Sequence, residues 1–259
     1  MDHSTPDGFP GALRTWRRAR RLSQLHLALE ADVSARHLSF LETGRAQPSR
    51  EMVERLGGAL RLPLAAQNRL LLQAGFAARY PTREWGADEM APVRAAIAHT
   101  LDRHAPYPAL ALDRLWRVVQ LNGPARALFG LLGVAEGDSL LDRMGSEGML
   151  AHIENWPEVA HHAAQRLWTE SAAQGGVPEL DRAAEQLSRT PRPRSAPPGP
   201  VIPTVFVADG LRLALFATVA QFGTPHDVTL DDLKIELYFP ADRTTDAALR
   251  AWPDTQGDR

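Results

Sequence analysis

The sequence predicts an all-α domain of five helices followed by an α+β domain with an antiparallel sheet. Residues 11–76 hold five short stretches with helical periodicity of apolar residues, each bounded by a capping residue, a glycine or a proline. Strand-like runs appear only after residue 100, and a helical stretch separates the first two from the remaining three. The charge also divides, because residues 1–80 contain 12 Arg and 7 acidic residues, whereas the rest of the chain contains 17 basic and 24 acidic residues.

The first three helices follow from amphipathic spacing and serine caps. The first helix is amphipathic, with five arginines among its polar residues. Ser23 precedes a second helix over residues 24–31, and Ser34 precedes a third over residues 35–42. A serine hydroxyl accepts a hydrogen bond from the first turn of a helix, so both serines are suitable N-caps.

Glycine and proline delimit the rest of this domain. Gly44 ends the third helix, because glycine readily takes the left-handed conformation at a helix C-terminus. Pro48 and Ser49 open a fourth helix, and Pro63 precedes a fifth over residues 65–74. The domain is therefore expected to be entirely helical.

Only Asp32 and Val33 separate the second and third helices, a tight spacing that is typical of a helix-turn-helix. Residues 23–45, SQLHLALEADVSARHLSFLETGR, resemble the helix-turn-helix of the Cro and phage-repressor class, also called the xenobiotic-response-element family. Its usual form is S-Q-x-x-L-A-x-x-A-G-V-S-x-x-x-[IL]-S-x-[IL]-E-x-G. The sequence departs from it at Asp32, where the pattern has glycine. Asp is among the few other residues that reach a left-handed backbone at small cost.

This resemblance implies a DNA-binding domain whose third helix enters the major groove, and the excess of Arg in residues 1–80 agrees with it. Gln24 and Arg45 would touch phosphates, while the outer face of the third helix would approach base edges. Arg36 is the side chain there that could make a bidentate bond to guanine. Simple solvation is the alternative for these exposed side chains. The predicted DNA-contacting residues are Gln24, Ser34, Ala35, Arg36, His37, Phe40 and Arg45.

The proline, glycine and charge content after the fifth helix indicates a linker. We therefore expect a first domain over residues 1–77, a linker over 78–88, a second domain over 89–248 and a tail over 249–259. In the second domain a long amphipathic helix precedes a proline-rich loop, at residues 190–200. The expected helices of this domain span residues 89–104, 123–132 and 157–173, and the expected strands span residues 108–112, 117–121, 201–207, 211–222 and 233–239.

Three segments of the second domain carry a further resemblance. They are Asp113-Arg114-Leu115-Trp116, Ile153-Glu154-Asn155-Trp156, and the stretch FGTPHDVTLDDLKIELYFPAD at residues 222–242. On these segments the region resembles the ligand-binding domain of MmyB-like (MltR-like) transcription regulators, which has a PAS-like α+β fold. The resemblance implies that a small apolar ligand, such as a fatty-acyl chain, lies between sheet and helices.

Inward-facing aromatic residues of the strands and helices are the candidates for contacting such a ligand. Their alternative role is to fill an ordinary hydrophobic core. Asn122 is expected to cap the following helix and not to contact a ligand. The predicted ligand-contacting residues are Trp116, Phe129, Trp156, Phe206, Phe216 and Tyr238.

Enzymatic and metal-dependent functions are not supported by the sequence. The chain has no cysteine, which excludes disulfides and thiolate metal sites and fits a cytoplasmic protein. Neither a signal peptide nor a membrane-spanning run of apolar residues is evident. Glu158 and His161 have the spacing of half a carboxylate-bridged metal site, but a second copy is missing. H-E-x-x-H, G-x-S-x-G and P-loop motifs are also missing. We expect no catalytic residue, cofactor or bound metal.

The resulting hypothesis is a homodimeric transcription regulator, which we favour as a repressor, that binds a double-stranded DNA operator. Its operator affinity would change when the apolar ligand occupies the second domain. One alternative is an antitoxin-type DNA-binding protein whose second domain binds a protein partner. Another is an enzyme with a regulatory DNA-binding domain, which would need convergent titratable groups in a cavity.

Overall fold

A computed structural model describes residues 8–191, 200–208, 210–223 and 225–252 of the 259-residue chain. The chain forms two compact units, of which the first is built mainly from residues before 83 and the second mainly from residues after it. Most of the predicted loop at 190–200, the first seven residues of the predicted first domain and residues 253–259 of the predicted tail lie outside the described residues. Among the described helices, none has the length and apolar content that a membrane span requires.

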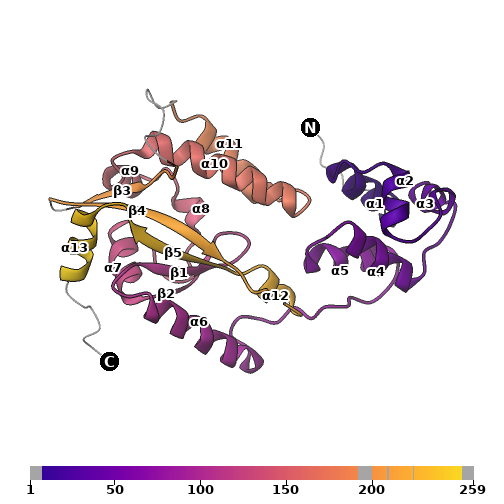
Figure 1. Cartoon of the computed structure of the whole chain (residues 1–259), viewed down its shortest axis with the longest axis horizontal. Helices are drawn as coiled ribbons and strands as arrows, with labels where there is room; N and C mark the ends of the chain where they lie inside the picture. The colour runs from indigo at the N-terminus through magenta and orange to yellow at the C-terminus, as the bar shows by residue number, and fades with distance from the viewer. Residues whose placement is uncertain (1–7, 192–199, 209, 224, 253–259) are drawn as a thin grey trace. The chain divides into compact units, whose positions relative to one another are not determined.

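The first unit contains the five predicted helices (Figure 1). Ser23, Ser34 and Ser49 all act as N-caps, since each hydroxyl accepts a backbone hydrogen bond from the residue three positions ahead. The first helix begins earlier than its arginines suggested, because Phe9 and Ala12 also enter the core. The helices are α1 (Gly8–Ala19), α2 (Gln24–Glu30), α3 (Ala35–Glu42), α4 (Arg50–Ala59) and α5 (Leu64–Gln73).

The turn between α2 and α3 has the expected backbone. Asp32 has a φ of +52°, which is the left-handed conformation that the motif requires at this position. Leu27 of α2 and Leu38 and Leu41 of α3 are fully buried in the core of the first unit. Their burial fixes the angle between the two helices and leaves the opposite face of α3 free of core contacts.

The second unit is an α+β fold with a single five-stranded antiparallel sheet, in the order β2-β1-β5-β4-β3. The predicted fold class is confirmed, including the helical insertion that separates the first two strands from the last three. The strands are β1 (Ala109–Leu112), β2 (Val118–Leu121), β3 (Thr204–Ala208), β4 (Leu211–Ala220) and β5 (Lys234–Pro240).

Helices cover both sides of this sheet (Figure 1). The helices α10 and α11 lie on one side, whereas α6 packs against β1 and β2 on the other. The helices of this part of the chain are the 3-10 helix η1 (Asp88–Met90), α6 (Ala91–Arg103), α7 (Gly123–Leu131), α8 (Leu140–Arg143), α9 (Glu147–His152), α10 (Trp156–Ala173), α11 (Pro178–Ser188), α12 (Val228–Asp231) and α13 (Arg243–Ala251).

Helices α8, α9, α11, α12 and α13 are additions to the sequence-based expectation. The first two have only four and six residues, too few to show a helical period. Helix α11 has a recognisable signal, because Pro178 occupies its first turn and Leu180 and Leu187 lie on one buried face. Helix α13 continues to Ala251, within the stretch that was expected to be a tail.

The strand register decides which side chains face the helices α10 and α11. In β1, Leu110 and Leu112 belong to the main core and pair with Glu236 and Lys234 of β5. Residues directly opposite each other in an antiparallel pair share one face of the sheet. Two charged side chains of β5 therefore lie on the same face as the hydrophobic core, and this placement shapes the site described below.

Candidate functional site

The outer face of α3 carries the predicted DNA-contacting side chains. Arg36 is exposed, while His37 and Phe40 are half-buried. The guanidinium carbon of Arg36 lies 5.4 Å from the centroid of the Phe40 ring, a cation–π contact. Such a contact limits the directions in which the Arg36 side chain can point, and both residues share the side of α3 that faces away from the core.

Three further residues predicted to contact DNA lie on or next to α3. The hydroxyl of Ser34 accepts a hydrogen bond from the backbone N–H of His37 at 3.1 Å, and Ala35 packs partly against the core. Arg45 is exposed just beyond the end of α3. The structure thus brings Ser34, Ala35 and the outer residues of α3 together on one element, with Arg45 following it in the chain.

Gln24 is held by an internal contact that the sequence did not suggest. Its side-chain amide donates to Glu42 at 2.8 Å, and Glu42 also receives two hydrogen bonds from the guanidinium of Arg17, at 2.5 and 2.8 Å. Glu42 is only 3% exposed. Burial raises the pKa of this carboxyl, but the hydrogen bonds from Arg17 and Gln24 outweigh it, so the pKa lies below its ordinary value. The hydrogen bonds among these three side chains connect α1, α2 and α3.

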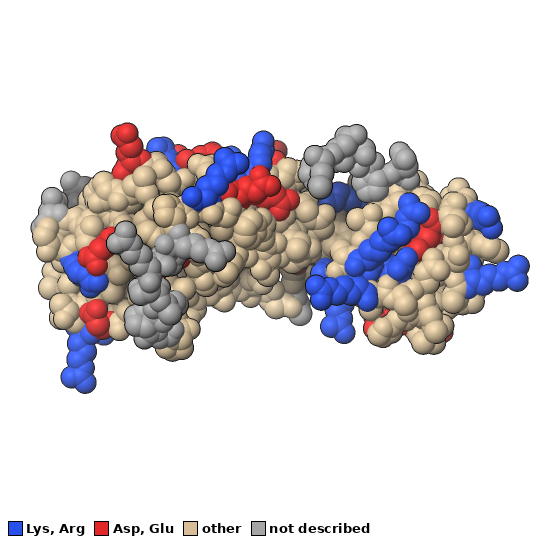
Figure 2. Space-filling view, turned by 90° about the horizontal axis from the view of Figure 1, so that it is seen from above, with Lys and Arg blue, Asp and Glu red and all other residues tan. Residues whose placement is uncertain are grey.

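Basic side chains gather on the surface of the first unit, at the right of Figure 2. In this unit the exposed arginines include Arg14, Arg18, Arg21, Arg36 and Arg45. Exposed arginines on a DNA-binding domain supply the positive charge that phosphate contacts need.

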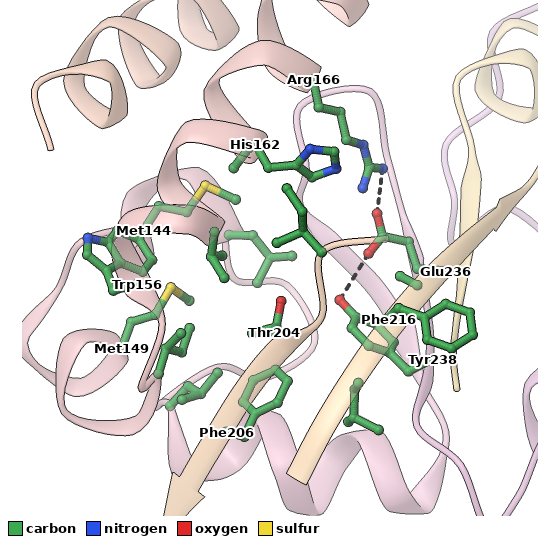
Figure 3. Close-up of a pocket in the computed structure, with 18 of the residues that line it drawn as sticks. Met144, Met149, Trp156, His162, Arg166, Thr204, Phe206, Phe216, Glu236 and Tyr238 are labelled. Atoms are coloured by element: carbon green, nitrogen blue, oxygen red, sulfur yellow. Dashed lines mark hydrogen bonds and ion pairs between the residues drawn. The ribbon is translucent and has the colours of Figure 1, made fainter. Parts of the chain in front are cut away.

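The second unit contains a pocket of about 450 Å³ between its sheet and its helices (Figure 3). A pocket of roughly 300–1,000 Å³ with mostly apolar walls is typical of small-molecule sites. The walls come from β3, β4 and β5 on one side and from helices α7 to α10 on the other. Apolar side chains of the walls include Leu132, Leu140, Met144, Met149, Ile153, Val159 and Leu215.

All six predicted ligand-contacting residues line this one pocket. They are Trp116, Phe129, Trp156, Phe206, Phe216 and Tyr238. Phe129 packs edge-on against both Phe206 and Tyr238, with ring centroids 6.4 and 5.7 Å apart. Phe216 differs from the other five, because its ring stacks on Phe239 at 5.8 Å. Phe216 and Phe239 lie directly opposite each other in the β4–β5 pair, so both rings are on the face of the sheet opposite to Tyr238. Phe216 therefore borders the pocket without turning its ring into it.

Trp116 has an unusual backbone and an unusual environment. Its φ of +58° is rare for a bulky residue, and the side chain of Asp113 holds the turn by accepting from the N–H groups of Leu115 and Arg117. The indole N–H donates to Glu170 at 2.8 Å. The guanidinium carbon of Arg166 lies 4.5 Å from the Trp116 ring centroid, so this wall of the pocket is both aromatic and charged.

One end of the pocket is polar, and its charged residues were not among the predicted ligand-contacting residues. There the guanidinium of Arg166 donates to a carboxylate oxygen of Glu236 at 2.5 Å, and the phenol of Tyr238 donates to the other oxygen at 3.1 Å (Figure 3). Behind them, Arg166 and Lys234 both pair with Glu170, at 2.9 and 2.5 Å. Lysine, arginine and glutamate are seldom buried unless paired in this way.

The protonation states of this cluster follow from its burial and its pairs. Burial lowers the pKa of Arg166, but Glu236 and Glu170 outweigh it, so the net pKa is raised and the guanidinium stays charged. Burial raises the pKa of Glu170, yet Lys234 and Arg166 bring it below its ordinary value. Burial and the neighbouring Glu236 raise the pKa of Tyr238 well above that of a free phenol, which keeps its O–H as a hydrogen-bond donor.

Residues considered for other roles have structural explanations. Asn122 caps α7 as predicted, because its side-chain oxygen accepts from the N–H of Ala125, and its amide donates to the carbonyls of Leu101 and Tyr107. The ring of His161 contacts the Pro157 carbonyl of its own helix at 3.0 Å. Within the described ranges, no group of three His, Cys, Asp or Glu side chains could hold a metal ion.

Two family models match the chain. The model of the MmyB-like transcription regulator ligand binding domain matches residues 93–251, which is more than half of the chain. A helix-turn-helix model matches residues 13–66. A comparison with curated proteins found no match. The two matched regions contain the recognition helix and the pocket, respectively.

Proposed function

Because the chain belongs to the family of MmyB-like transcription regulators, with a helix-turn-helix ahead of the ligand-binding domain, we propose that it represses transcription under ligand control. In this proposal a homodimer binds a palindromic operator, and occupancy of the pocket by a small apolar ligand changes its operator affinity. The two matched families are a DNA-binding helix-turn-helix and a ligand-binding domain, so DNA binding and ligand binding follow from the matches. The repressor role, the dimer and the class of ligand are our proposal.

The observation that carries this proposal is the aromatic-lined pocket between the sheet and the helices of the second unit. A domain that only bound a protein partner would not need a pocket of about 450 Å³ between its sheet and its helices. An enzyme would need convergent reactive groups, whereas the acidic and basic side chains at the polar end are paired with one another. These features favour ligand binding over both alternatives.

For DNA contact we propose the seven residues predicted from the sequence, with two refinements. Arg36 and Phe40 would meet base edges as a stacked pair, since they contact each other on α3. Gln24 would meet a phosphate only through those polar atoms that its hydrogen bond to Glu42 leaves available. We also propose that the two domains span residues 1–77 and 89–248, joined by the linker at 78–88.

Calorimetry combined with operator binding tests this function. An apolar compound such as dodecanol should raise the thermal stability of the full chain and shift its affinity for operator DNA, because a ligand that favours one state shifts the equilibrium toward it. Compounds should also be compared by chain length, since each buried methylene adds up to roughly 0.8 kcal/mol until the pocket is full. If no apolar compound changes either quantity, the protein-partner alternative replaces the proposal.

A further inference from the structure

Two short segments from later in the chain belong to the first compact unit. Residues 172–176 form the end of α10 and the turn after it, and residues 225–231 contain α12. The rest of α10 belongs to the second unit, where Ala163 and Arg166 line the pocket. The second segment precedes β5, which carries the pocket residue Glu236. Both segments are therefore continuous with walls of the pocket.

The turn after α10 packs closely on α1. A Cβ atom added at Gly175 would overlap two carbons of the Trp16 ring, so the contact requires glycine at this position. Trp16 itself belongs to the core of the first unit. At the neighbouring Gly176, an added Cβ would meet none of the described heavy atoms within 4 Å. The close contact is thus specific to Gly175.

Two arginines hold the end of α10. The guanidinium of Arg20, on α1, donates a hydrogen bond to the carbonyl of Ala173 at 3.3 Å. The guanidinium of Arg69, on α5, donates to the carbonyl of Gln174 at 3.4 Å. The last carbonyl groups of a helix have no partner within the helix, and cationic side chains are favourable there. Helices α1 and α5 therefore complete the C-terminus of α10.

The second segment completes the N-terminus of α5. Pro63 precedes α5 and provides no side-chain hydrogen bond to its first turn. Instead, the carboxylate of Asp231 accepts a hydrogen bond from the backbone N–H of Leu64 at 2.8 Å. Beside it, the N–H of Val228 donates to the carbonyl of Pro81 at 2.9 Å. A residue from the end of α12 thus caps a helix of the DNA-binding domain.

Helix α1 connects these contacts to the recognition helix. Trp16 is followed by Arg17, whose guanidinium donates two hydrogen bonds to Glu42, the last residue of α3. A change in the contact between Gly175 and Trp16 would therefore reach α3 through two neighbouring residues of one helix.

Building on the ligand control proposed above, we propose that residues 172–176 and 225–231 transmit the occupancy of the pocket to the DNA-binding helices. A ligand in the pocket changes the packing of α10 and β5, and the two segments pass this change to α1 and α5. Two sites are coupled when an element between them has two arrangements that both sites bias. Here these arrangements are the segments docked on α1 and α5 and the segments released from them.

A pair of glycine variants tests the contact at the end of α10. Gly175 and Gly176 both have a positive φ, +86° and +96°, so alanine strains the backbone at either position, but only Gly175→Ala also collides with Trp16. Operator dissociation constants are measured with and without saturating dodecanol. Dodecanol should change them roughly five- to 150-fold for the natural sequence and Gly176→Ala, and less than about twofold for Gly175→Ala. Calorimetry verifies that both variants still bind dodecanol.

Aspartate variants test the second segment and decide the question should Gly175→Ala fail to fold. Asp231→Ala removes the cap of α5 and should reduce the response to dodecanol, whereas Asp231→Asn should keep it, because asparagine also caps helices. Asp242→Ala is the matched control. Asp242 caps α13, inside the second unit, by accepting from the N–H of Thr245 at 2.7 Å.

Hydrogen exchange without ligand tests the docking itself. Peptides that contain Trp16 or the first turn of α5 should exchange faster in Gly175→Ala than in Gly176→Ala, because released segments no longer protect them. Equal exchange in the two variants, or a full response to dodecanol in Gly175→Ala, would overturn the transmission while leaving ligand control intact. A natural sequence that does not respond to dodecanol would instead contradict the proposed function and, with it, this transmission.

Discussion

Arg166 of α10 and Glu236 of β5 form an ion pair, with a nitrogen–oxygen distance of 2.5 Å, at the polar end of the pocket. The pair joins the helical wall to the sheet wall, and Arg166 also stacks on Trp116. A ligand long enough to fill the pocket would reach this pair. A bound ligand that contacts this pair would change the packing of α10 against β5. A sensor domain needs a local change of this kind.

Arg36→Ala should weaken binding to the operator by roughly 1–3 kcal/mol and relax the preference at one base pair per half-site, because a bidentate contact to guanine would be lost. Arg45→Ala should weaken binding to operator and random DNA alike and flatten the salt dependence, as expected for a phosphate contact. Fluorescence anisotropy with both DNAs at several salt concentrations distinguishes the two. Equal losses on both DNAs for Arg36→Ala would contradict a base contact.

Glu42→Gln should destabilise the first domain at neutral pH by roughly 1–3 kcal/mol, because the half-buried Arg17 would lose its charged acceptor. The pKa of Glu42 is lowered in the folded state, so its contribution is present above the pKa of an unfolded carboxyl, about 4.3, and is lost as pH falls through the folded value. The free energy of unfolding, measured with urea from neutral to acidic pH, should fall less steeply for Glu42→Gln than for the natural sequence. Identical pH profiles would exclude this role.

Ala163→Phe should block ligand binding while the protein stays folded. Ala163 lies on α10 and lines the pocket, so the larger side chain would enter an existing hollow. The loss of stability should therefore be smaller than the roughly 1–3 kcal/mol that overpacking a filled core costs. Gln165→Phe, at an exposed position of the same helix, is the matched control. Unchanged dodecanol affinity in Ala163→Phe would place the ligand elsewhere.

A symmetric dimer should protect two half-sites about 34 Å apart on one face of the operator, because a short recognition helix such as α3 reads few base pairs alone. Hydroxyl-radical footprinting gives the spacing, and light scattering of the complex gives the number of chains. Protection of a single half-site by a monomer at saturating concentration would contradict the dimer.

The first domain could be predicted closely because its signals are local. Ser23 and Ser34 cap the helices that follow them, and Asp32 lies at the turn, so neighbouring residues determine these features. The hydrogen bonds from Arg17 and Gln24 to Glu42 could not be predicted in the same way, since they join residues of three different helices.

The pocket was likewise predictable only in part. Its aromatic walls could be predicted because Phe206 and Tyr238 belong to short runs rich in β-branched and aromatic residues, which are typical of strands. Its polar end could not, since Arg166 and Glu236 are 70 positions apart and pair only once the sheet register is known. Met144 and Met149 were missed because the short helices beside them have no detectable period.

The central claim is that occupancy of the pocket alters DNA binding. Its most direct test is the operator affinity of the full chain with and without saturating dodecanol, measured in parallel on Ala163→Phe and Gln165→Phe. We predict a change of roughly five- to 150-fold for the natural sequence and for Gln165→Phe, the range of a coupling of about 1–3 kcal/mol, and no change for Ala163→Phe. An operator affinity that stays constant while calorimetry shows the pocket filled would contradict ligand control, because a ligand with equal affinity for both states shifts nothing.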